Sequence, residues 1–142
     1  MGICRPKGEQ TNMAKTLQNE LTVSREKMAA YRATMERRGR EKRVEWTRRR
    51  ERAWKVAQQA ADILRTQFDA TRVVVFGSLA RGTWFSGVSD IDLAAWGVKD
   101  EDYFTAVARL QDLSPEFKID LIAMERCKPA LRTTILREGK LV

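Results

Sequence analysis

The stretch from Val73 to Ala95, VVVFGSLARGTWFSGVSDIDLAA, decides the fold class because it holds two short apolar runs. Val73–Phe76 is a β-branched run that ends at Gly77–Ser78, which predicts a buried strand followed by a sharp turn. Ile91, Leu93 and the two alanines after it form the second run, and Gly97 ends it. The stretch therefore predicts two strands separated by a turn and a short helix.

The flanking sequence completes an α/β pattern. Residues 16–68 contain no proline, one glycine and many helix-forming residues, which predicts a long helix or two helices that divide at Gly39. A further helix is expected over Asp102–Leu113, a third strand over Phe117–Ala123, and a final short helix between Pro129 and Gly139.

Charge and composition divide the chain into three parts, which we expect to be a disordered tail (1–15), a basic helical extension (16–54) and a folded domain (55–142). The net charge of +8 lies entirely within residues 1–70. Two interpretations of the basic helix remain open, a nucleic-acid-binding arm and a solvated face that contacts a partner. Interleaved glutamates and the lack of an aromatic stacking platform favour the second.

One face of the extension is apolar, with Leu21, Met28, Tyr31 and Met35 at helical spacing. The segment between this face and Trp54 has too few apolar residues to pack on a sheet. We therefore expect the helix before about Trp46 to stand away from the domain and to contact either a second copy of the chain, giving a homodimer, or another protein.

Composition excludes several classes of protein and site. The chain has no histidine and only two cysteines, so it lacks the residues for a Ser-His-Asp triad or a four-ligand structural zinc site. It has no apolar run of the ~18 residues that a membrane-spanning helix needs, and its N-terminus does not resemble a secretory signal. A reduced, cytoplasmic protein is the simplest expectation.

Three aspartates occupy unusual positions in the predicted strands. Asp90 and Asp92 lie two residues apart, so their side chains should share one face, and such a pair of like charges favours a bound cation. Asp120 interrupts the apolar third strand. The alternatives are an Asx turn at Asp90 and a salt bridge at Asp120. Hard oxygen ligands without histidine or thiolate would select Mg²⁺, or Mn²⁺ as an alternative.

Gly77, Ser78 and Arg81 follow the first strand directly and could surround a phosphate group. Glycine permits a close approach of backbone to ligand, and a serine hydroxyl with backbone amides at a helix start can bind phosphate oxygens. Arg81 lies one helical turn further on. A turn followed by an ordinary helix N-cap would explain the same residues without any ligand.

Together these residues resemble the minimal nucleotidyltransferases of the polymerase β superfamily. That family carries Gly-Ser after a strand, then Asp-x-Asp, then a third carboxylate on a later strand, as Gly77-Ser78, Asp90-Ile91-Asp92 and Asp120 do here. The resemblance covers roughly residues 55–142. It implies a mixed sheet of about three or four strands with helices on one side, ATP as the nucleotide donor, and two divalent metal ions.

By the same resemblance, Asp90, Asp92 and Asp120 would be the metal ligands and catalytic residues, and Gly77 and Ser78 would hold phosphates. Small members of this family often act as antitoxins that transfer AMP to a tyrosine of a HEPN-domain toxin, so a protein adenylyltransferase with a HEPN partner is expected. The alternatives are transfer to a small molecule or a nucleic-acid end, and a non-catalytic basic module that binds nucleic acid.

Overall fold

The computed structural model describes residues 7–82 and 90–142, with side chains from residue 13 onward. The chain divides into two compact units that meet between Arg43 and Val44. We call them the N-terminal unit and the C-terminal unit. Residues 83–89, which join the predicted short helix to the second predicted strand, lie outside the described residues.

The first element, α1, is one helix over Lys7–Gln67. Gly39 does not divide it, since one glycine within a helix costs only about 1 kcal/mol relative to alanine. The helix begins nine residues before the predicted Thr16, directly after Pro6, and no proline lies between residues 7 and 16 to interrupt it. The part of the predicted tail from residue 7 to residue 15 is therefore helical.

In the N-terminal unit α1 is exposed along its described length. The described side chains from residue 13 to Arg43 are exposed, apart from two partly buried positions. No helix in the described part of the chain is long and apolar enough to cross a membrane.

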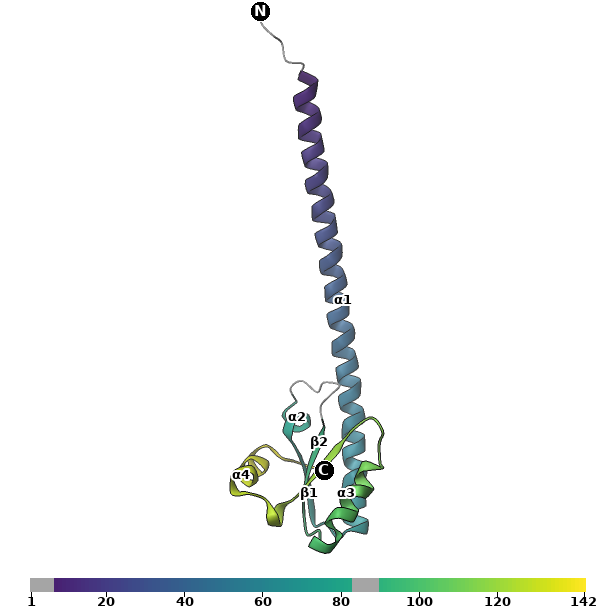
Figure 1. The fold of residues 1–142 in the computed structure, drawn as a ribbon, viewed down its shortest axis with the longest axis vertical. Coiled ribbons are helices and arrows are strands. Elements are labelled where there is room, and N and C mark those ends of the chain that lie inside the picture. Colours follow the sequence, from purple (N-terminus) through teal and green to yellow (C-terminus); the bar gives the residue numbers. More distant parts are fainter. Residues whose placement is uncertain (1–6, 83–89) are drawn as a thin grey trace, which may run out of the picture. The chain divides into compact units, whose positions relative to one another are not determined.

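The C-terminal unit is built on a four-stranded mixed sheet, which confirms the predicted fold class (Figure 1). The strand order is β3-β2-β1-β4, in which β1 runs antiparallel to β2 and β4, while β2 and β3 are parallel. Its elements in chain order are β1 Arg72–Phe76, α2 Gly77–Arg81, β2 Ile91–Trp96, η1 Asp100–Asp102, α3 Tyr103–Gln111, β3 Ile119–Ala123, η2 Met124–Arg126, α4 Pro129–Glu138 and β4 Lys140–Leu141.

The main core lies on one face of the sheet, under α3 and the second half of α1. Alternate strand residues such as Val75, Leu93 and Ile119 are buried there. They pack with Leu64 of α1 and Leu110 of α3. Apolar residues at helical spacing in this half of α1 face the core: Ala57, Ala61 and Leu64 are buried, and Trp54 is partly buried against them.

A second, smaller core lies on the opposite face. Ile135 of α4 and Met124 of η2 pack there against Val74 and Ala94, and Figure 1 shows α4 across the sheet from α3. The expectation of helices on one side of the sheet is therefore wrong, because the even-numbered strand residues also need an apolar cover.

Side chains of α3 cover the free edge of β3. The Tyr103 hydroxyl donates a hydrogen bond to the carbonyl of Leu121 at 2.6 Å, and the Gln111 amide donates to the carbonyl of Ile119. These bonds occupy acceptors that an edge strand would otherwise offer to another chain. The buried contacts of α3 come from Ala106 and Leu110, whereas Phe104 is 79% exposed.

Glu116 connects α1 to the loop before β3. It accepts hydrogen bonds from Arg52 Nη2 at 2.8 Å and from Arg49 Nη1 at 3.2 Å. The Arg49 guanidinium also stacks over the Phe117 ring, 4.6 Å from its centroid. Because Arg49 and Arg52 belong to the basic extension predicted for residues 16–54, part of that extension packs on the domain.

Candidate active site

The pairing of β2 with β3 brings two of the three predicted aspartates together. Asp92 and Asp120 are direct partners in the parallel register, so their side chains leave the same face of adjacent strands. Neighbouring strands lie about 4.8 Å apart, which puts the two carboxylates side by side. The two aspartates therefore share one face of the sheet.

Gly77 lies directly against the side chain of Asp92. It has a φ of +73°, and a Cβ atom added to it would lie 2.3 Å from Oδ2 of Asp92. Any other residue would be strained by the backbone angle and would displace the carboxylate. The glycine predicted for a close approach to a ligand is thus also needed for the close approach of Asp92.

The charges of Asp120 and Asp90 both act on the carboxylate of Asp92. The pKa of Asp92 is raised to about 6, first by burial and then by the charges of Asp120 and Asp90, while Arg81 opposes the shift. Their negative charges disfavour the ionisation of Asp92, and a bound cation would relieve this repulsion.

Asp120 differs from its prediction in one respect. Its side chain is 45% exposed, and Oδ1 lies 3.9 Å from the ammonium group of Lys118. The alternative of a salt bridge is therefore present, although an exposed pair of this length contributes little to stability. Sequence reasoning missed Lys118, but the alternation of strand residues would have placed it on the same face as Asp120.

The remaining predicted residues flank the carboxylates. Ser78 is partly buried near the start of α2, Arg81 is exposed at its end, and Asp90 is partly buried directly before β2. Arg50 of α1 donates a hydrogen bond to the carbonyl of Gly82 at 3.3 Å, so it fixes the chain just after α2. No sequence signal pointed to Arg50, because the contact depends on how α1 packs.

The donor set suits a hard divalent cation such as Mg²⁺, since carboxylate oxygens are its preferred protein ligands. Among the residues that the structure describes, no three acidic or cysteine side chains are close enough to form a complete metal cage. The structure therefore does not bring Asp90, Asp92 and Asp120 together as the three metal ligands that the resemblance implied.

Comparison with known proteins agrees with this geometry. Residues 58–142 match the family model described as polymerase beta, nucleotidyltransferase. No curated protein matches the chain.

Several solved structures resemble the fold. A crystal structure of a toxin–antitoxin with AMP-PNP is 20% identical over 60% of this chain and 70% of that chain, with a TM-score of 0.52. A structure of a tri-AMPylated HEPN toxin of Shewanella oneidensis in complex with MNT antitoxin is 16% identical over 63% of this chain and 70% of that chain, with a TM-score of 0.49. A structure of a minimal nucleotidyltransferase is 27% identical over 70% of this chain and 94% of that chain, with a TM-score of 0.44.

Proposed function

Because the chain belongs to the polymerase β nucleotidyltransferase family, we propose that it transfers AMP from ATP to a hydroxyl group. The observation that carries this proposal is Asp92, a carboxylate whose pKa is raised by burial and by Asp120 and Asp90 and which lies against the backbone of Gly77. In the transfer, the acceptor oxygen forms a bond to the α-phosphorus. The bond from that phosphorus to the bridging oxygen breaks, and pyrophosphate leaves.

We assign the residues as follows. Asp90, Asp92 and Asp120 would hold Mg²⁺ together with phosphate oxygens of ATP, since Mg²⁺ is commonly bound by one or two carboxylates and by the phosphates of its substrate. When bound, two such ions supply charge neutralisation at the attacking and leaving oxygens. Asp120 would accept the proton of the acceptor hydroxyl, and its exposed position gives an acceptor access to it.

The residues around α2 would hold the triphosphate. Gly77 brings the backbone close to the carboxylates without a side chain in the way, so β- and γ-phosphate oxygens could lie beside it with the Ser78 hydroxyl as a donor. Arg81 already exerts its charge on Asp92, which places a cation where polyphosphate charge would develop.

We propose a tyrosine of a HEPN-domain toxin as the acceptor, with this chain acting as the antitoxin. The support is the shared fold with a chain of a toxin–antitoxin structure that contains AMP-PNP, a close analogue of ATP.

The test is to incubate the protein with ATP, Mg²⁺ and a HEPN protein encoded beside it, and to measure the mass of both proteins. We expect the HEPN protein to gain the mass of AMP, and we expect Asp92→Asn to abolish the gain. If added RNA or a small molecule gains the mass of AMP and the HEPN protein does not, the reaction is as proposed but the acceptor is a different one. No product with any acceptor would contradict the proposal.

A further inference from the structure

The N-terminal unit presents an apolar seam with a repeat of seven residues. One series of positions spaced by seven holds Ala14, Leu21, Met28 and Met35, and the second holds Leu17, Ser24 and Tyr31. The large seam residues are 47–61% exposed. A strict seven-residue repeat is the pattern of a coiled coil, and an isolated helix is marginal in water, so this seam needs a partner helix.

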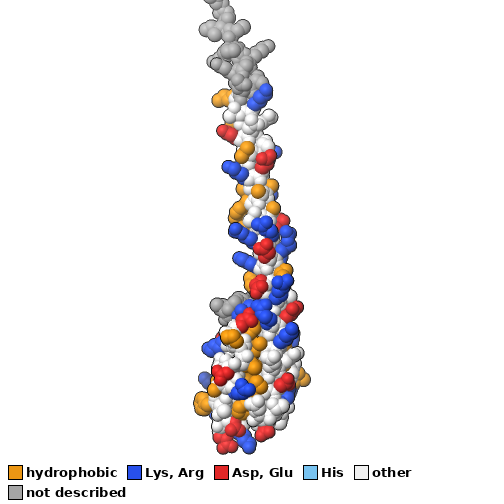
Figure 2. Space-filling model, turned by 90° about the vertical axis from the view of Figure 1, so that its right-hand side faces the viewer, with side chains coloured by type: hydrophobic (Ala, Val, Ile, Leu, Met, Phe, Trp, Pro, Cys, Tyr) orange, Lys and Arg blue, Asp and Glu red, His pale blue; other side chains and the backbone are white. Residues whose placement is uncertain are grey.

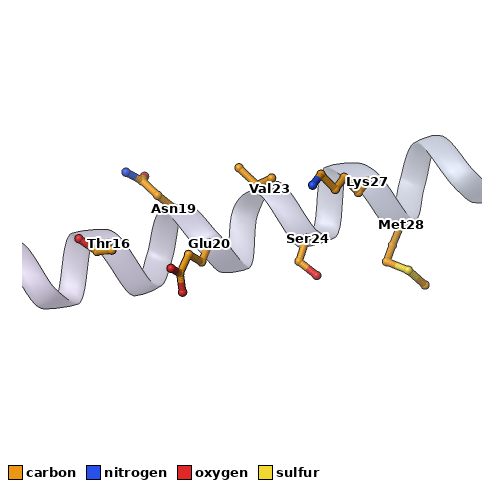
Figure 3. Close-up of a pocket in the computed structure, with 7 residues that line it drawn as sticks. All are labelled: Thr16, Asn19, Glu20, Val23, Ser24, Lys27 and Met28. Atoms are coloured by element: carbon orange, nitrogen blue, oxygen red, sulfur yellow. The ribbon is translucent and has the colours of Figure 1, made fainter.

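The geometry of the helix agrees with this pattern. A shallow groove on α1 is lined by seven residues of this helix alone, from Thr16 to Met28 (Figure 3). In that view the seam residues Ser24 and Met28 point to the same side, whereas Val23, which is outside the seam, points to the other. The groove is therefore an open helix surface, which suits another helix better than a small ligand.

Charge decides the direction in which a second copy would bind. Residues 32–43 hold six Lys or Arg and two Glu, a net of +4, whereas residues 14–31 hold three and two, a net of +1. Figure 2 shows the concentration of basic side chains along the middle of the helix. A parallel, in-register pair would place the two +4 segments side by side, and an antiparallel pair over residues 14–31 would place them at opposite ends.

One antiparallel register satisfies both size and charge. With Leu21 opposite Ser24 of the second copy, Met28 lies opposite Leu17 and Tyr31 opposite Ala14. The first and last of these layers pair a large side chain with a small one, and the middle layer pairs two side chains of similar volume. The flanking pair is then Glu20 with Lys27, which occurs twice. A shift of one heptad either way puts Lys27 beside Lys27 or Glu20 beside Glu20, which is unfavourable.

We propose that residues 14–31 of α1 form an antiparallel coiled coil with the same residues of a second copy of this chain. The overlap of 18 residues is about 27 Å long at 1.5 Å per residue. The proposal is independent of the chemistry at Asp92. Residues 14–31 have a net charge of only +1, and their Glu20 and Lys27 pair with each other across the two copies. The seam therefore fits a second copy better than an acidic partner.

Sedimentation of the full chain at several concentrations tests the proposal through charge reversal. We expect a monomer–dimer equilibrium that Glu20→Lys and Lys27→Glu each weaken about tenfold, because each variant converts two attractive pairs into repulsive ones. The double variant E20K/K27E should restore dimerisation. Glu26→Lys and Lys15→Glu, which make the same charge changes outside the seam and its flanks, should leave the equilibrium unchanged.

Two results would overturn the proposal. In a parallel pair residue 27 would face Arg32 of the second copy, and a glutamate at position 27 would attract that arginine. A tighter dimer for Lys27→Glu would therefore show that the two helices run parallel. A chain that stays monomeric at all concentrations would show that the seam belongs to a different partner.

Discussion

The Oδ2 atom of Asp92 occupies the space that a side chain at Gly77 would need, at 2.3 Å from an added Cβ. Gly77→Ala therefore combines this overlap with a φ of +73°, and we expect it to destabilise the C-terminal unit by about 2 kcal/mol or more. It should also displace the carboxylate and weaken Mg²⁺-dependent binding of ATP. Urea unfolding and calorimetry measure the two effects.

Gly39→Ala is the matched control for this variant. An added Cβ at Gly39 meets no atom within 4 Å, and the residue lies inside α1. Alanine favours a helix by about 1 kcal/mol over glycine, so this variant should raise helix content and leave ATP binding unchanged. Equal loss of ATP binding in both variants would show that the close approach at Gly77 is unimportant.

Asp92→Asn should stabilise the protein at pH 8 when metal and nucleotide are absent. The pKa of Asp92 is raised to about 6 in the folded state, so its ionisation costs stability above pH 6 and costs nothing below about pH 4. The gain should be about 1 kcal/mol after allowance for partial solvent exposure, and it should disappear as the pH falls from 6 to 4. Thermal unfolding across this range measures it.

Asp112→Asn removes an exposed carboxylate that is not part of the site and serves as the control. If the difference in unfolding free energy between Asp92→Asn and the unchanged protein stayed constant from pH 4 to pH 8, the ionised form of Asp92 would not be disfavoured in the folded state.

Glu116→Gln should weaken the attachment of α1 to the loop before β3. Hydrogen bonding from Arg52 lowers the pKa of Glu116, so its stabilising effect is complete above the unfolded value of about 4.5 and is lost as the pH falls below it. The loss at pH 7 should be no more than about 1 kcal/mol, since the pair is exposed. Glu101→Gln is the control, and similar unfolding curves for both variants would contradict the role of Glu116.

Removal of residues 1–43 should leave the C-terminal unit folded. The buried residues of α1 begin at Ala53, and the contacts of Arg49 and Arg52 with Glu116 are retained in the shorter chain. A cooperative thermal transition with near-UV circular dichroism like that of the full chain is expected. Loss of that transition would mean that the first part of α1 is needed for folding.

Much of the fold could be predicted because the local patterns agree with the final packing. The runs at Val73–Phe76 and Ile91–Ala95 became β1 and β2, since a short β-branched run between turn residues has few alternatives. β4 could not be predicted, because Lys140–Leu141 is a two-residue strand that exists only through its pairing with β1. The tie from Glu116 to Arg49 and Arg52 joins residues more than sixty positions apart, which no local pattern shows.

The candidate site was predictable for a different reason. An aspartate inside an apolar strand is unfavourable, so Asp92 and Asp120 stand out, and alternation then fixes the face that each one occupies. Their register across β2 and β3 and the ion pair of Asp120 with Lys118 needed the structure. The roles of Asp90, Ser78 and Arg81 toward a metal ion and a nucleotide remain predictions.

Parallel reactions with ATP labelled at the α- or the γ-phosphate test the transfer of the nucleotidyl group most directly. With Mg²⁺ and the HEPN protein, we expect label from α-labelled ATP to appear on that protein, and label from γ-labelled ATP to appear only in pyrophosphate. Asp92→Asn and Asp120→Asn should lose both signals. Transfer of the γ-label to the acceptor, or transfer of the α-label that survives in Asp92→Asn, would contradict the account.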